Sequence, residues 1–137
     1  MVKNIIKSDN IFSFFQEPAS ESDLYIIDDL IDTLKFNLKG CVCMSASMIG
    51  YNKRIIVYLD RDNKINYMIN PTILDKSLEY MTQEGCLSLD GIRNTKRYKK
   101  IKIEYYNNKF QKRIKTFNGF TAEIIQHEID HLNGIII

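Results

Sequence analysis

Seven residues near the end of the chain, Gln126–His127–Glu128–Ile129–Asp130–His131–Leu132, contain the pattern HExxH. On a helix, residues four apart lie on one face, so the imidazoles of His127 and His131 can reach one metal ion. Glu128 points about 100° away from His127, and its longer side chain can reach a water beside that ion. No other histidine occurs in the chain. The motif predicts a catalytic metal site, with a buried structural histidine pair as the alternative.

Such a site needs a third protein ligand, and the cysteines are the candidates. Cys86 lies in the segment Glu84–Gly85–Cys86–Leu87–Ser88–Leu89, which we expect to form an edge strand beside the helix. Cys41 and Cys43 lie near an expected loop and compete for the same role. A free cysteine can also be a small buried hydrophobic residue. Spacing alone leaves the choice among the three cysteines open.

Composition indicates an ordinary globular protein. The chain has 137 residues, of which 45% are apolar and 26% charged, so we expect one domain spanning residues 1–137. No apolar run approaches the ~18 residues of a membrane span, and the N-terminus lacks the apolar segment of a secretion signal. Three cysteines do not make a disulfide framework and fit a reducing compartment. These features predict a cytoplasmic protein with no membrane partner.

Charge gives little support for nucleic-acid binding. The net charge of +2 is too small to indicate a nucleic-acid partner by itself. Residues 99–115 are basic, but a solvated sheet face explains them more simply than an RNA contact. We therefore expect no specific nucleic acid among the partners.

The periodicity of the chain predicts a helix, then strands, then a second helix. After an irregular lead-in over residues 9–20, apolar residues recur at helical spacing over residues 20–38, where Ser20 and Asp23 form a variant of the capping box. A hairpin is expected from residues 54–59 and 64–69, closed by Pro71, and a second one from residues 101–117. Short strands are expected at residues 78–81 and 86–89, and a helix at residues 119–132 that stops at Asn133–Gly134. This order favours the α+β class over alternating βαβ units.

Two motifs taken together resemble those of peptide deformylases. Residues 84–88 have the sequence EGCLS and residues 126–132 have QHEIDHL, in the order in which the family has them. Residues 69–71 and 96–101 also look like the corresponding family segments, so the resemblance extends over residues 20–137. It implies a deformylase-like fold with antiparallel sheets packed around a C-terminal metal-binding helix and with an N-terminal helix.

The resemblance also implies a site and a reaction. Cys86, His127 and His131 would bind one divalent metal ion, Fe²⁺ with Zn²⁺ or Ni²⁺ as alternatives. Glu128 would be the general acid and base, and the backbone N–H of Leu87 would help to hold the developing oxyanion. The family removes the formyl group from N-terminal formyl-methionine of new bacterial chains, so the expected partners are formyl-methionyl peptides or nascent chains. Because the chain ends at Ile137, we expect no ribosome docking through a further C-terminal helix, and ribosome contact stays open.

The first family motif, GxGxAAxQ, is altered in this chain. The aligned residues 41–48 are CVCMSASM, so Cys41 and Cys43 replace both glycines and Met48 replaces the glutamine. That glutamine donates a hydrogen bond to the formyl oxygen, and methionine has no donor. Losing one oxyanion donor typically costs ~10²–10³ in turnover. Ser45, Ser47 or a water molecule could supply the donor instead.

Three hypotheses about function follow. The leading one is a metal-dependent hydrolase of the deformylase type with reduced activity. The second is a non-catalytic paralogue that keeps the metal and binds N-terminal peptides, and Met48 is the reason to retain it. The third is a zinc endopeptidase, which HExxH alone suggests and the cysteine-containing motif opposes.

Overall fold

The computed structural model describes residues 1–137 with the exception of the side chain of Asp9. The long helices are α1 (Tyr25–Phe36) and α2 (Gly119–Leu132), and short 3-10 helices are η1 (Asp9–Phe12), η2 (Glu21–Asp23) and η3 (Ala46–Ile49). One five-stranded antiparallel sheet has the order β1-β2-β3-β4-β5. Its strands are β1 (Cys43–Ser45), β2 (Ile55–Leu59), β3 (Ile65–Gly85), β4 (Ile92–Tyr106) and β5 (Lys112–Asn118). The predicted α+β class is confirmed, with a single curved sheet.

Strand β2 separates two apolar clusters, which explains its continuous apolar sequence. Ile55 and Val57 pack in the cluster that contains α1, whereas Ile56 and Tyr58 pack in the cluster that contains α2. Successive side chains of a strand point to opposite faces, so a strand with a helix on each side buries all of them. The two helices therefore lie on opposite faces of β2.

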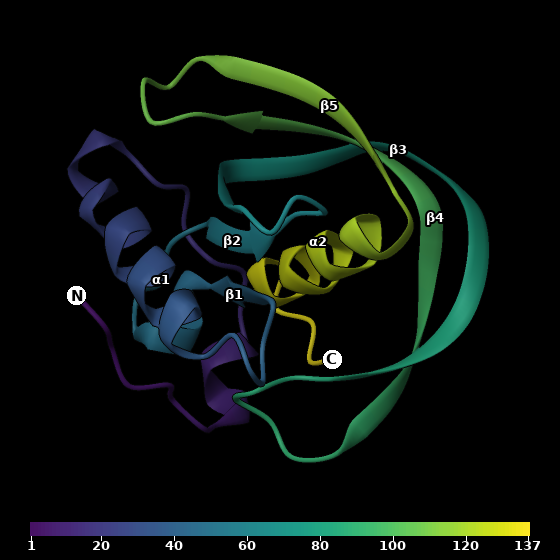
Figure 1. The fold of residues 1–137 in the computed structure, drawn as a ribbon, viewed down its shortest axis with the longest axis horizontal. Helices are drawn as coiled ribbons and strands as arrows, with labels where there is room; N and C mark the ends of the chain where they lie inside the picture. The colour runs from purple at the N-terminus through teal and green to yellow at the C-terminus, as the bar shows by residue number, and fades with distance from the viewer.

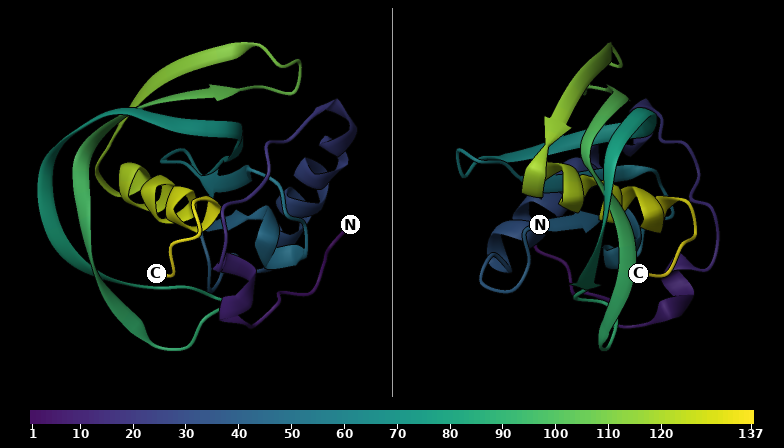
Figure 2. Two further views of the ribbon diagram at one scale, coloured as in Figure 1. Left: turned by 180° about the vertical axis from the view of Figure 1, so that it is seen from behind. Right: turned by 90° about the vertical axis from the view of Figure 1, so that its right-hand side faces the viewer.

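Helix α2 lies inside the curve of the sheet. The long strands β3 and β4 sweep around it in Figure 1, and the view from behind in Figure 2 shows the same enclosure. Ile124, Ile125 and Ile129 are 6%, 0% and 3% exposed, so the predicted burial of this helix is confirmed. Its observed bounds match the predicted range of residues 119–132.

Polar contacts fix the position of α2 at its middle and at its end. Gln126 Nε2 donates to the carbonyl of Tyr98 in β4 at 2.8 Å, and its Oε1 accepts from the Tyr98 N–H at 2.9 Å. Arg54 Nη1 donates to the carbonyl of Leu132 at 2.8 Å, where the helix ends. Gly134 follows at φ 79°, and a Cβ there would lie 2.9 Å from the carbonyl carbon of Phe14, so no larger residue fits. No helix among the described residues is long and apolar enough to cross a membrane.

Strand β3 differs most from its prediction. The first hairpin forms as expected, with Ile55 paired to Ile69, but Pro71 does not close it. The strand continues past Pro71 to Gly85. A shift in the pairing with β4 between Ile69 and Thr72 leaves Asn70 and Pro71 outside the regular ladder, so the proline does not interrupt the hydrogen bonds of the strand. Proline is tolerated at such bulges since it needs no ladder hydrogen bond there. The expected short strand at residues 78–81 is therefore part of β3.

Smaller differences concern the segments that flank the site. Residues 86–89 form a turn rather than an edge strand, and the Leu89 N–H donates to the Cys86 carbonyl at 3.1 Å. Ser20 and Asp23 form the expected capping box, but it starts η2, and α1 itself begins at Tyr25. The lead-in is less irregular than expected, because Phe12 ends the 3-10 helix η1 and is fully buried.

Candidate metal centre

The three predicted ligands come together in the folded chain. Cys86 lies directly after β3, whereas His127 and His131 lie on α2. One ligand atom from each of the three residues lies within 4.8 Å of the others. Sulfur and imidazole donors in this number suit a first-row transition metal such as iron, nickel or zinc. The donor set therefore fits the implied metal ion.

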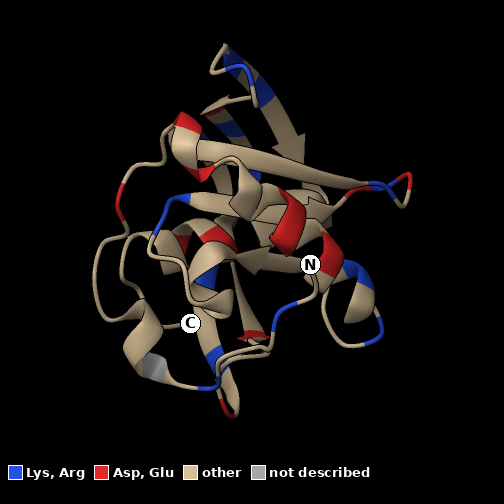
Figure 3. Ribbon diagram, turned by 90° about the vertical axis from the view of Figure 1, so that its left-hand side faces the viewer, with Lys and Arg blue, Asp and Glu red and all other residues tan. Residues whose placement is uncertain are grey.

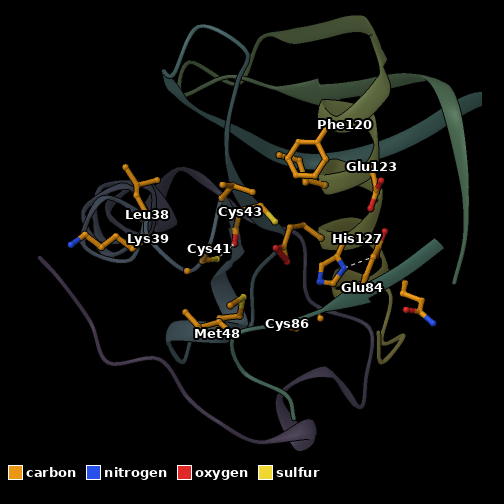
Figure 4. Close-up of a pocket in the computed structure, with 17 residues that line it drawn as sticks. Leu38, Lys39, Cys41, Cys43, Met48, Glu84, Cys86, Phe120, Glu123 and His127 are labelled. Carbon is orange, nitrogen blue, oxygen red and sulfur yellow. Dashed lines mark hydrogen bonds and ion pairs between the residues drawn. The ribbon is translucent and has the colours of Figure 1, made fainter. Parts of the chain in front are cut away.

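Glu84 orients the first histidine. Its Oε1 lies 2.7 Å from His127 Nδ1, which leaves Nε2 as the nitrogen available to a metal (Figure 4). Burial by itself raises the pKa of Glu84, but hydrogen bonds from His127 and Arg97 outweigh it and lower the pKa to about 2. Burial also lowers the pKa of His127, but its bonds to Cys86 and Glu84 raise that pKa to about 9. Glu84 is thus a buried carboxylate that fixes the ring of His127.

Arg97 in β4 completes a buried ionic network behind the histidine. Its Nη2 donates to Glu84 Oε1 at 2.7 Å and its Nε to Glu84 Oε2 at 2.9 Å, a bidentate pair. Its Nη1 donates to Asp130 Oδ2 at 2.6 Å. Arg97 is 3% exposed. The end of β3, the middle of β4 and helix α2 are thereby joined at one guanidinium.

His131 is held by an aromatic contact. Its imidazole is fully buried and stacks on the ring of Phe12, with ring centroids 3.8 Å apart and an angle of 13° between the planes. The two histidine rings meet edge to face at a centroid distance of 4.5 Å. This contact could not be predicted from local patterns, because Phe12 lies more than a hundred positions before the helix that it contacts.

Glu128 is 1% exposed and lies beside both histidines. Its Oε1 is 2.8 Å from His131 Nδ1. Burial by itself raises the pKa of Glu128, but the charge of His131 and the hydrogen bond with it lower the pKa below its usual range. The nearby Cys43 side chain also lowers the pKa of Glu128, whereas burial raises the pKa of Cys43 itself, which favours its thiol form. Glu128 is accordingly a carboxylate, ready to accept a proton.

A cavity of about 380 Å³ opens onto this group (Figure 4). Its lining includes Cys86, His127 and Glu128 together with Met48 and Leu87. Met48 thus lies on the wall of this cavity, and its thioether brings no hydrogen-bond donor there. Ser45 and Ser47 do not line this cavity, and their hydroxyls hydrogen-bond each other at 3.1 Å. The cavity wall therefore lacks both proposed serine donors.

The remaining cysteines line the cavity but stay outside the ligand group. Cys41 Sγ donates to the backbone carbonyl of Cys43 at 2.7 Å. Burial raises the pKa of the Cys41 thiol to about 12. Among the described residues, the group able to hold a metal contains Cys86 alone of the three cysteines. The folded structure therefore favours Cys86 as the third ligand, a choice among the three cysteines that the sequence spacing left open.

Comparison with known proteins agrees with this geometry. The family profile described as polypeptide deformylase matches residues 11–137. The chain belongs to the peptide deformylase family. The chain is 51% identical to a peptide deformylase of Clostridium beijerinckii over 137 residues, which is 100% of both chains.

Solved deformylases have the same fold. A class I type b peptide deformylase of Acinetobacter baumannii superimposes with a TM-score of 0.87 at 28% identity, covering 99% of this chain and 97% of that one. A Thermotoga maritima deformylase gives a TM-score of 0.87 at 28% identity, covering 99% and 95%. The predicted deformylase fold is confirmed. Family membership also favours the hydrolase hypothesis over a non-catalytic deformylase paralogue and over a zinc endopeptidase.

Proposed function

We propose that this deformylase removes the N-terminal formyl group from formyl-methionyl peptides and nascent chains. The observation that carries the proposal is the convergence of Cys86, His127 and His131 beside the buried carboxylate of Glu128 at the wall of one cavity. The related Acinetobacter baumannii structure holds Met-Ala-Ser, a peptide with a free N-terminal methionine. Such a peptide is what removal of a formyl group from formyl-Met-Ala-Ser would leave.

We infer that Cys86, His127 and His131 hold one divalent metal, with Fe²⁺ preferred and Zn²⁺ or Ni²⁺ as alternatives. When bound, the ion activates water and polarises a carbonyl group as a Lewis acid. Glu128 accepts the proton of the attacking water and then gives it to the departing amine nitrogen, so one carboxylate acts as base and then as acid. The products are formate and a free N-terminus.

Two residues shape the stabilisation of the oxyanion in this proposal. The N–H of Leu87, in the turn after Cys86, donates to the developing oxyanion. Met48 offers a thioether in place of the family's amide donor, so turnover is reduced but not abolished. Apolar side chains of the cavity wall, including Val42, Phe120 and Ile124, suit an apolar methionine side chain. Formylated nascent chains and three free cysteines together favour a cytoplasmic location.

The proposal is tested by metal content and formate release together. Protein purified anaerobically is expected to contain one metal ion per chain and to release formate from formyl-Met-Ala-Ser. A Cys86→Ala, His131→Ala double variant is expected to lose both. Cys41→Ala is the matched control, because this thiol lines the same cavity outside the ligand group, and it is expected to keep the metal. Full metal stoichiometry in the double variant would show the ligand assignment to be wrong.

The same assay separates catalysis from binding alone. A non-catalytic paralogue would keep the metal and bind formyl-Met-Ala-Ser without releasing formate. Metal-loaded parent protein that binds the peptide but gives no formate above the metal-free control would therefore overturn the proposed reaction while leaving the metal site intact.

A further inference from the structure

Glu123 is a carboxylate on the wall of the metal-centre cavity that the proposed reaction does not use. It lies four residues before His127, on the same face of α2, and both residues line the cavity (Figure 4). The hydroxyl of Tyr80 in β3 donates to Glu123 Oε1 at 3.1 Å. Arg97 neutralises Glu84 on the same wall, but Glu123 forms no ion pair with any described residue. Its charge therefore lacks a partner.

The surroundings of Glu123 supply no nearby cation. Lys39 is the single Lys or Arg among the residues that line the cavity, and Figure 4 shows it on the other side, with its side-chain nitrogen directed outward. Residues 92–118 hold ten of the nineteen Lys and Arg residues, and Figure 3 shows basic residues along this hairpin at the top of the molecule. Burial raises the pKa of Glu123, and the neighbouring Glu84 raises it further. A cationic ligand would remove this electrostatic penalty.

The cavity wall on either side of Glu123 is apolar. Phe120 and Ile124 lie beside it on α2, and Val42 also lines the cavity. Phe120 is 63% exposed, so a ligand can cover its ring. Lysine and arginine side chains have the same division, because an aliphatic stem carries a charged head. A methionine side chain matches the apolar part of this wall but leaves Glu123 without a partner.

We propose that the cavity also accepts N-formyl peptides whose first residue is arginine or lysine, and that Glu123 is the specificity-determining residue that binds the cationic head. The aliphatic stem lies against Phe120 and Ile124, and the head donates to the carboxylate oxygen that Tyr80 leaves free. This inference rests on the proposed function, because the same metal centre removes the formyl group. Water adds across the formyl C–N bond, so the products are formate and a free N-terminal arginine or lysine, and no further reactant is needed.

The test compares two variants that each lose one negative charge. Glu123→Gln changes the cavity, whereas Glu79→Gln changes an exposed residue of β3 that does not line it. The value of kcat/KM for formate release is measured with formyl-Arg-Ala-Ser, formyl-Met-Ala-Ser and formyl-Met-Arg-Ser on metal-loaded protein. Calorimetry with the product peptides Arg-Ala-Ser and Met-Ala-Ser measures binding independently of catalysis. Metal content and urea unfolding check that both variants are folded.

The parent is expected to hydrolyse formyl-Arg-Ala-Ser. The ratio of its kcat/KM for this peptide to that for formyl-Met-Ala-Ser is expected to fall at least about tenfold in Glu123→Gln, as loss of a hydrogen-bonded charge predicts. Binding of Arg-Ala-Ser is expected to weaken by a similar factor, and Glu79→Gln is expected to keep the parent ratio.

An unchanged ratio in Glu123→Gln, or an equal fall in Glu79→Gln, would overturn the inference. Turnover of formyl-Met-Ala-Ser by the parent without turnover of formyl-Arg-Ala-Ser would do the same, and so would an effect of Glu123 confined to formyl-Met-Arg-Ser. A parent that releases no formate from any peptide would overturn the proposed reaction. In that case, weaker binding of Arg-Ala-Ser by Glu123→Gln would still support recognition of the cation, whereas equal binding would overturn it.

Discussion

Replacing Glu84 by glutamine tests the buried network behind the metal centre. Glu84 is 8% exposed and accepts hydrogen bonds from Arg97 at 2.7, 2.9 and 3.2 Å, in addition to its contact with His127 at 2.7 Å. Its low pKa makes it a carboxylate near neutral pH, so glutamine removes a full charge. Removing one partner of a buried ion pair costs ~3–5 kcal/mol of the free energy of unfolding. Asp130 still neutralises Arg97 from the other side, so we expect about 2–4 kcal/mol.

The loss of this carboxylate is also expected to weaken the metal site. A group that orients a ligating histidine is typically worth ~10–100-fold in metal affinity. Urea unfolding of the metal-free proteins measures the first effect, and competition with a chelator measures the second.

Glu79→Gln is the matched control on the same strand. Glu79 and its partner Lys96 have side chains 62% and 57% exposed and lie 3.4 Å apart. Exposed pairs contribute ~0.2–1 kcal/mol, so this change is expected to have little effect on unfolding and none on metal affinity. If Glu84→Gln and Glu79→Gln proved indistinguishable in both measurements, the role assigned to Glu84 would be refuted.

Further changes address other parts of the site. Glu128→Ala is expected to keep the metal but to lose ~10²–10⁴ in formate release, and the parent rate in this variant would contradict its role as the proton carrier. Met48→Gln is expected to raise kcat by ~10-fold or more with a smaller change in KM, because the new donor bonds most strongly to the transition state; equal kinetics with the same metal would exclude Met48 as the missing oxyanion element. Phe12→Ala is expected to cost ~3–5 kcal/mol in unfolding and to weaken metal binding, whereas Phe36→Ala, at a side chain 76% exposed, is expected to do neither. Similar unfolding and metal affinity in those two variants would disprove the importance of the Phe12 stack on His131.

Features that depend on neighbouring residues could be predicted from the chain alone. Helix α2 was predicted with its bounds, because helical spacing of apolar residues and the stop at Asn133–Gly134 are local signals. The hairpin of β2 and β3 follows likewise from two apolar runs around a polar turn. The fold class followed from the order of the predicted helices and strands, and the family and the candidate ligands followed from two short motifs with specific chemistry.

Other features depended on contacts between distant segments. Pro71 was predicted to end a strand, since local propensity cannot show that β3 bulges there and continues against β4. The spacing of three cysteines could not select Cys86, which becomes the third member of the group only when the end of β3 lies beside α2.

The residues that support the site belong to this second class. Arg97 and Phe12 look like ordinary surface and lead-in residues in the sequence, yet the fold buries them against Glu84 and His131. Burial and pairing arise only when two distant segments come together, so they cannot be predicted from the sequence of either segment alone. The candidate ligands could therefore be proposed from short motifs, whereas the residues that surround and support them were decided by how the curved sheet encloses α2.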